Sequence, residues 1–260
     1  MPLTYSSYLK LDELLSLQKP ISDGPEHDET LFIIIHQVYE LWFKEVLHEL
    51  DYLGTLLLET NTSLALHTFK RVLTILKVLV AQIDILETIT PLDFLSFRDR
   101  LESGSGFQSY QFRELEFMLG RRDRESIERF PEGSEGRRKL EARFQQPVLW
   151  DVFLRYLADN GYAIPTELLD RDVTAPPQSS SGVQEILTDI YRTNPSIVPV
   201  CERLVDLDEG LQEWRYRHVK MVERTIGTRQ GTGGSAGAEY LKTTLMRPVF
   251  PDLWAIRTEL

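Results

Sequence analysis

The sequence of 260 residues lacks several features that would place it in whole classes of protein. It has one cysteine, Cys201, so it cannot form an internal disulfide, and nothing in it indicates an oxidising compartment. The longest apolar stretch, residues 31–35, is far too short to cross a bilayer. The first residues carry neither a basic segment nor an apolar run, so we expect no signal peptide. We therefore expect a soluble, cytoplasmic protein.

Clustered basic residues are also scarce. The chain has 40 acidic and 29 basic residues, which gives a net charge of -11. Nucleic acids and anionic membranes both attract clustered Lys and Arg, so we expect neither as a partner. The short basic cluster at residues 121–124 predicts a solvated surface turn. Because 42% of the residues are hydrophobic, the chain can bury a large core, and we expect a single domain over residues 1–260.

What the sequence does contain is helical periodicity. Apolar residues recur every three or four positions, which predicts long helices over residues 31–58, 64–89 and 196–226. The same spacing predicts shorter helices over residues 91–101, 108–119, 135–160 and 183–191. No alternation typical of strands persists, so the predicted fold class is all-α, with a helical bundle-like domain. Two segments break the pattern: a flexible loop is predicted over residues 171–182, and residues 227–237 contain five glycines.

Two histidines lie on apolar helical stripes. His218 lies in the middle of one stripe in residues 196–226, and His36 shares another with Phe32 and Phe43. A buried imidazole needs a hydrogen-bond partner or a metal. Each histidine can therefore be a hydrogen-bonded core residue. Alternatively, His218 can be the axial ligand of a haem iron, and His36 can hydrogen-bond a substrate or transfer a proton.

The predicted helix over residues 91–101 combines an aromatic ring, a guanidinium and an aliphatic side chain on one face. Phe94 and Arg98 are four positions apart, and Leu101 follows three later. Arginine binds carboxylates through two parallel hydrogen bonds, so this face suits an amino acid with a planar side chain. A solvated arginine on an amphipathic helix is the alternative interpretation.

Two further patterns suggest sites that the rest of the sequence does not support. The glycine-rich residues 231–235 follow a predicted helix, whereas nucleotide-binding glycine loops follow a strand. We interpret them as a mobile loop that closes over a site with the hydroxyls of Thr232 and Ser235, or as a plain connector. Glu45 and His48 form a Glu-x-x-His pair, but a di-iron bundle needs two such pairs and two more carboxylates.

Five separated blocks together resemble one family. Residues 27–44, HDETLFIIIHQVYELWFK, closely resemble a signature of tryptophan 2,3-dioxygenases. Residues 86–98, 105–109, 214–218 and 231–235 resemble later blocks of the same family in the same order. The resemblance implies an all-helical dioxygenase that uses O2 to cleave the indole C2–C3 bond of L-tryptophan. The implied product is N-formyl-L-kynurenine, and the implied cofactor is haem b, ferrous in the active state.

The resemblance also implies roles for individual residues. His218 corresponds to the proximal iron ligand, and Ser105 and Gly106 correspond to the stretch against the distal face of the haem. His36 corresponds to the catalytic distal histidine that hydrogen-bonds the indole N–H. The residues expected at the substrate are Phe32, His36, Phe94, Arg98, Leu101, Thr232, Tyr5 and Tyr8.

Tyr5 and Tyr8 match a Tyr-x-x-Tyr pattern near the N-terminus of the family, where a tyrosine reaches the site of a neighbouring subunit. We therefore expect residues 1–30 to form an arm that contacts a neighbouring subunit. We expect the chain to assemble into a homotetramer. The stretch between Tyr8 and Phe32 looks shorter than is usual in the family. Two alternative functions stay open. Members of the same superfamily insert one oxygen atom into tryptophan derivatives to give oxindoles, and this chain could do the same. It could also be a haem sensor without catalytic activity.

Overall fold

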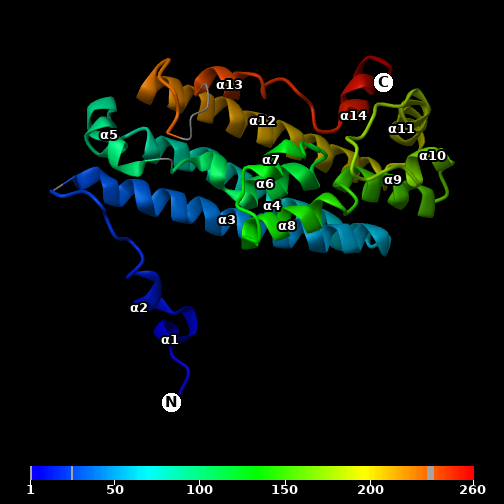
Figure 1. The fold of residues 1–260 in the computed structure, drawn as a ribbon. Helices are drawn as coiled ribbons and strands as arrows, with labels where there is room; N and C mark the ends of the chain where they lie inside the picture. Colours follow the sequence, from blue (N-terminus) through cyan, green and yellow to red (C-terminus); the bar gives the residue numbers. More distant parts are fainter. Residues whose placement is uncertain (1, 25, 103, 233–236) are drawn as a thin grey trace.

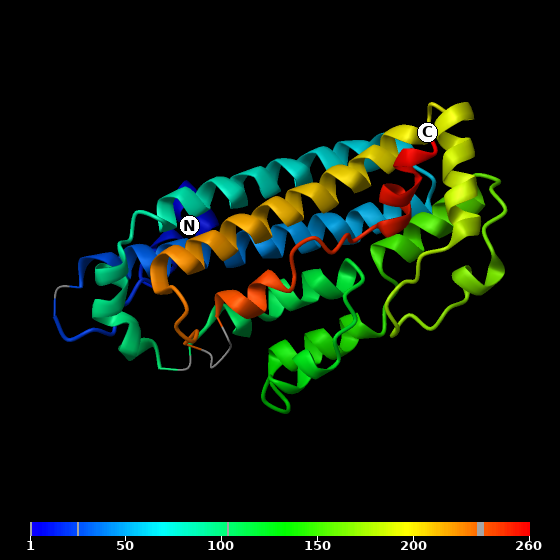
Figure 2. The same ribbon diagram turned by 90° about the horizontal axis from the view of Figure 1, so that it is seen from above.

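The computed structural model describes residues 2–24, 26–102, 104–232 and 237–260. Every regular element in these ranges is a helix, which confirms the predicted all-α class. Three long helices form the body: α3 (His27–Leu58), α4 (Thr62–Leu86) and α12 (Val198–Ile226). Helix α4 packs against both α3 and α12, and Figures 1 and 2 show the three running side by side along the long axis.

The long helices form because each presents an apolar face of helical spacing to the others. Helix α3 buries a stripe that crosses its whole length. Its members are Ile35, Tyr39, Phe43, Val46, Leu50, Leu53 and Leu57. The side chain of Asn61 caps α4 by accepting a hydrogen bond from the backbone of Leu64 at 3.3 Å. Helix α12 ends at Gly227, whose φ of 61° suits a residue without a side chain.

Shorter helices cover this body. They are α6 (Tyr110–Met118), α7 (Glu125–Glu128), α8 (Glu135–Phe144), α9 (Leu149–Asp159), α10 (Thr166–Leu169), α11 (Ser181–Thr193) and α14 (Pro251–Ala255), with the 3-10 helix η3 (Ile256–Thr258). Figure 2 shows α6, α7 and α8 along one side of α3, and α9, α10 and α11 at the end away from α5. The helices pack mainly through one core that joins α3, α4, α9, α11 and α12.

The prediction of a single helix over residues 135–160 was wrong. The segment forms α8 and α9, which are separated by residues 145–148. Pro147 lies in this break; it has no N–H to donate and disfavours a helical conformation at the residue before it. Helix α9 then starts anew, because the Asp151 carboxylate accepts a hydrogen bond from the backbone of Val148 at 2.9 Å.

The predicted loop at residues 171–182 and the predicted surface turn at 121–124 need correction. The loop lacks helix up to Ser180, but Gly182 lies inside α11. Its end is tied down, since Ser179 and Ser180 both donate hydrogen bonds to Asp252 of α14. The turn is not fully solvated, because Arg121 and Arg122 are half-buried and donate to protein groups.

One end of the body collects the elements that matter for function. Helix α5 (Pro91–Arg98) packs against α3 and α12, and α13 (Ala238–Lys242) packs against α12. Thr90 and Asp93 form a capping box that starts α5, and Pro91 occupies the first turn. The 3-10 helices η1 (Asp99–Leu101) and η2 (Gly106–Gln108) connect α5 to α6. Across the described ranges, no helix combines the length and apolarity that a bilayer crossing needs.

Candidate active site

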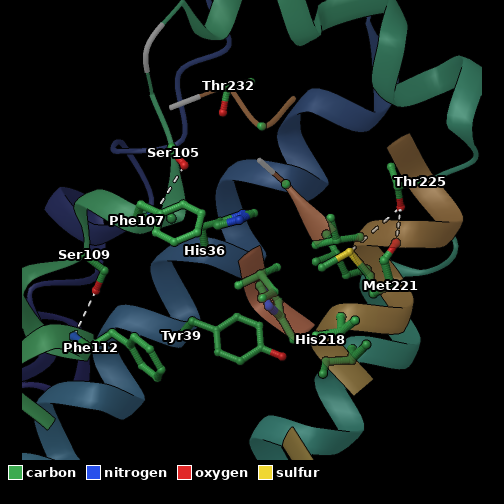
Figure 3. Close-up of a pocket in the computed structure, with 18 of the residues that line it drawn as sticks. His36, Tyr39, Ser105, Phe107, Ser109, Phe112, His218, Met221, Thr225 and Thr232 are labelled. Atoms are coloured by element: carbon green, nitrogen blue, oxygen red, sulfur yellow. Dashed lines mark hydrogen bonds between the residues drawn. The ribbon is translucent and has the colours of Figure 1, made fainter. Parts of the chain in front are cut away.

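A large cavity opens at this end of the body. Its empty space, with the open mouth included, measures about 1510 Å³. One wall comes from α3, a second from the C-terminal half of α12, and a third from α5 and residues 105–113. Figure 3 shows His36 and His218 entering the same space from different helices. The walls are mainly apolar, which suits a bound small molecule or cofactor.

His36 stands ready to accept a hydrogen bond inside the cavity. Its Nδ1 lies 2.7 Å from the backbone oxygen of Phe32. A carbonyl oxygen can only accept, so Nδ1 carries the proton and Nε2 of the neutral ring has a free lone pair. Burial lowers the pKa of His36 below 6.5, although the Phe32 carbonyl and Glu40 partly oppose this shift. The ring is therefore neutral at pH 7 and can accept an N–H bond.

His218 occupies the opposite wall, on α12. Its pKa is lowered to about 4, mainly by burial and to a smaller extent by His36 and Arg215. Among the described residues, none donates a hydrogen bond to this ring or accepts one from it. The indole of Trp214 stacks on the imidazole with a centroid distance of 5.2 Å and an interplanar angle of 8°. His218 is thus a neutral imidazole whose nitrogens have no hydrogen-bond partner among the described residues, which favours a ligand role over that of a hydrogen-bonded core histidine.

Aromatic rings line the cavity beside His36. Phe32 lies 4.1 Å from the His36 ring, 5.8 Å from Phe94 and 5.5 Å from Phe97, measured between centroids. Phe32 and Phe94 line the cavity, whereas Phe97 is buried behind them. Stacked and edge-on aromatic pairs stabilise one another and offer a flat apolar surface. This arrangement suits a planar aromatic side chain placed next to Nε2 of His36.

Two polar residues, Arg98 and Thr232, line the same cavity. Arg98 lines the cavity and donates from a terminal guanidinium nitrogen to the backbone oxygen of Gln230. Within the described chain its buried Nε has no hydrogen-bond partner. The Thr232 hydroxyl donates to the backbone oxygen of Gly104 at 2.6 Å. The segment before α13 is thereby joined to the segment after α5, and Arg98 keeps donors for an anionic ligand.

Ser105 and Gly106 also line the cavity, at the start of η2. The Ser105 hydroxyl accepts a weak hydrogen bond from the backbone of Phe107 at 3.4 Å. A Cβ built on Gly106 would meet no atom within 4 Å, so the space beside this residue is open. Figure 3 shows Ser105 and Thr232 on one side of the cavity, and Phe112 and His218 farther from them.

Three of the expected substrate residues do not line this cavity, and one expected loop residue cannot be placed. Leu101 lies in η1 and is half-buried outside the lining. Tyr5 and Tyr8 are 75% and 70% exposed in α1 (Tyr5–Leu9), which with α2 (Leu11–Leu14) projects away from the body in Figure 1. Ser235 lies outside the described residues.

The sequence analysis missed a charged cluster that borders the cavity. The Glu116 carboxylate is 4% exposed and pairs with Arg113, Arg121 and Arg215. Burial alone would raise the pKa of Glu116, but the three guanidiniums hold it below its ordinary value. The Arg113–Glu116 spacing of three was visible in the sequence, whereas Arg215 is 99 residues away and no local pattern could reveal it.

Comparisons with known proteins point to one family. A family model described as tryptophan 2,3-dioxygenase matches residues 1–131 and 181–260. A protein of Herpetosiphon aurantiacus with the same name is 61% identical over 99% of this chain and 98% of its own length. The chain belongs to the tryptophan 2,3-dioxygenase family. A namesake from Anaeromyxobacter is 58% identical over 98% of this chain and 95% of its own length. A relative of the same name from Bacillus cereus is 40% identical over 99% of this chain and 93% of its own length.

Membership of the tryptophan 2,3-dioxygenase family confirms the resemblance found in the sequence and makes the chain an oxidoreductase. It supports cleavage of tryptophan rather than the alternative oxindole-forming reaction. The residues of the cavity also fit a haem. A neutral imidazole that has no hydrogen-bond partner among the described residues is a suitable iron ligand, and the apolar walls suit a porphyrin.

Proposed function

We propose that the chain binds haem b, ferrous in the active state, and cleaves the indole C2–C3 bond of L-tryptophan with O2 to give N-formyl-L-kynurenine. One observation carries the proposal. A single cavity brings the unpartnered imidazole of His218 together with Phe32, His36 and Arg98, which suit an aromatic amino acid. When bound, the haem would supply the activation of O2, a redox chemistry that side chains do not provide.

We assign the cofactor contacts as follows. His218 would ligate the iron, because it is neutral, buried and held in place by Trp214. Ser105 and Gly106 would lie against the other face, where the structure leaves open space beside Gly106. Both assignments agree with what the family resemblance implies for these positions.

The substrate contacts follow from the chemistry of tryptophan. The guanidinium of Arg98 would bind the carboxylate, and the hydroxyl of Thr232 would meet the same amino-acid end. The indole would pack against the rings of Phe32 and Phe94, with its N–H donating to Nε2 of His36. Since Phe94 has no hydroxyl, it contributes packing and no carboxylate contact. Leu101 stays a proposed member of the substrate site at its edge.

Positioning is the main catalytic contribution of these side chains. Holding both ends of tryptophan fixes C2 and C3 in one place and removes much of the entropic barrier of a bimolecular step. His36 would act catalytically by holding the indole proton in a hydrogen bond, with no need to remove it. The apolar walls would limit the contact of the reacting carbons with water.

The protonation state of His36 gives a pH prediction. Protonated His36 has no acceptor for the indole N–H, so activity should fall as the pH drops through its pKa. That pKa is lowered from 6.5, because burial disfavours the charged ring. We expect kcat/KM for tryptophan to stay level down to pH 6.5 and to decline only below it. A His36→Gln variant should lose this acid limb, and an unchanged acid limb in the variant would contradict the role of His36.

We also propose that residues 1–30 form an arm on a single haem domain, and that the arm contacts a neighbouring copy in a homotetramer. No residue of α1 or α2 is buried, although Leu3, Tyr5, Tyr8 and Leu15 are apolar and at least 70% exposed. Such apolar surface is typical of an interface. The mass of the full chain in solution tests this, since a monomer would contradict it.

We place the protein in the cytoplasm, because Cys201 is free and buried.

The product tests the proposed reaction. The full chain should be loaded with haem, reduced, and mixed with L-tryptophan and O2. N-formyl-L-kynurenine, identified by mass and ultraviolet absorbance, is the expected product. An oxindole would move the chain to the monooxygenase reaction, and the absence of any product with haem bound would favour a sensor.

A further inference from the structure

The cavity has a second cationic region apart from Arg98. Arg113 and Arg215 both line the cavity, and each contacts the ring of Phe112 with its guanidinium, at 5.7 and 5.9 Å from the centroid. Phe112 lies well away from Thr232 in Figure 3, on the side where His218 enters. Arg98, by contrast, bonds to Gln230, two residues before Thr232. The cavity therefore offers two separate places for an anionic group.

The two guanidiniums are buried and incompletely bonded. The side chains of Arg113 and Arg215 are 8% and 11% exposed. Throughout the described residues, each donates a single hydrogen bond, and in both cases the acceptor is Glu116. A guanidinium has five N–H donors, so several donors of each arginine lack a protein acceptor. None of these unpaired nitrogens is among the fully buried polar atoms, so they are accessible and can donate to a ligand in the cavity.

The charge of the cluster is also incomplete. One carboxylate, Glu116, meets three guanidiniums, including Arg121, which is a third exposed and also bonds to Tyr240. Asp123 interacts electrostatically with Arg121 and partly balances its charge. Glu40 lines the cavity, but its carboxylate accepts from Gln111 at 2.7 Å. Positive charge therefore remains at Arg113 and Arg215.

The pair spans two walls of the cavity. Arg215 is on α12, three residues before His218, whereas Arg113 on α6 lies over Phe107, 5.5 Å from the ring centroid. A ligand that lies between the wall of His218 and the wall of Phe107 would present its edge to both guanidiniums. A porphyrin with carboxylate groups on its edge has this shape and charge.

We propose that Arg113 and Arg215 form a carboxylate-binding subsite that receives a propionate of the bound porphyrin, with Glu116 holding both guanidiniums in place. The inference rests on the proposed function, in which a haem occupies the cavity. Arg98 is then left for the substrate carboxylate. The division explains why the two cationic regions lie apart.

Porphyrin binding tests the subsite without any measurement of activity. Haem and its dimethyl ester, which lacks the propionate charges, are titrated into the haem-free full chain, and binding is followed by the Soret band. Losing charge-assisted hydrogen bonds costs about 1.5–3 kcal/mol, so the unmodified chain should bind haem about ten- to a hundredfold more tightly than the ester. Arg113→Gln and Arg215→Gln should abolish most of this preference, and Lys at either position should restore part of it.

Arg121→Gln is the matched control, because Arg121 bonds to the same Glu116 but does not line the cavity. This variant should keep the preference for haem. Equal affinity of the unmodified chain for haem and for the ester would overturn the proposed subsite. This comparison does not depend on whether any variant folds. A preference that persists in both Gln variants would also overturn it. If haem itself does not bind, the proposed function fails together with the subsite. If haem binds as tightly as its ester, only the subsite fails.

Discussion

Replacing His218 with alanine should abolish haem binding and, with it, tryptophan cleavage. Within the described chain, the cavity holds two histidines, His36 and His218, and His36 already commits Nδ1 to the Phe32 carbonyl. His218 is neutral and free to ligate an iron. Because the cofactor supplies the reaction with O2, activity should fall to the background level without protein. The absorbance spectrum of the ferrous protein after haem loading is the measurement.

His48 provides the control for this substitution. It is an exposed histidine on α3, so His48→Ala should leave both the spectrum and the activity unchanged. A His218→Gly variant supplied with free imidazole should regain part of its haem binding, since the added ligand takes the place of the side chain. If His218→Ala keeps the ferrous spectrum of the unmodified protein, the axial assignment is wrong.

Replacing Arg98 with alanine should weaken tryptophan binding by about a hundredfold and leave haem binding intact. The guanidinium is half-buried in the cavity, and among the described residues only one of its terminal nitrogens is bonded, to Gln230. Two charge-assisted hydrogen bonds to a carboxylate are therefore available, and their loss costs about 1.5–3 kcal/mol. The dissociation constant of tryptophan, measured through the haem spectrum, reports the change.

Arg100 is the neighbouring arginine for comparison. It bonds to the Ser96 backbone oxygen at 3.0 Å and lies 3.6 Å from the Glu26 carboxylate, outside the cavity. Arg100→Ala should leave tryptophan affinity near that of the unmodified chain. The assignment of Arg98 fails if Arg98→Ala reduces haem and tryptophan binding equally, because that result indicates general damage to the cavity.

The long helices could be predicted because their signal is local. Periodic apolar residues over tens of positions determine both the helical state and the buried face, as in α3 and α12. Where several short elements meet, periodicity alone does not fix the boundaries. Pro147 breaks a helix that the apolar pattern continues through, and α13 and α14 are too short to produce a detectable stripe.

The same distinction applies to the candidate site. His36 and His218 stood out because a polar ring interrupts an apolar stripe, which is visible within one helix. The partners of Arg98 and Glu116 lie 132 and 99 residues away, at Gln230 and Arg215, so only the fold reveals them. Arg121 was interpreted as solvated although its acceptor Glu116 is only five residues earlier, because the sequence pattern does not show how the chain turns after α6.

Labelled oxygen tests the central claim most directly. The haem-loaded, reduced protein is mixed with L-tryptophan under oxygen-18 gas, and the product is identified by mass spectrometry. The account predicts N-formyl-L-kynurenine that carries two labelled atoms, because one atom of O2 ends on C2 and the other on C3. A product with a single labelled atom would contradict the account, since the reaction would then be a monooxygenation on the same helical framework.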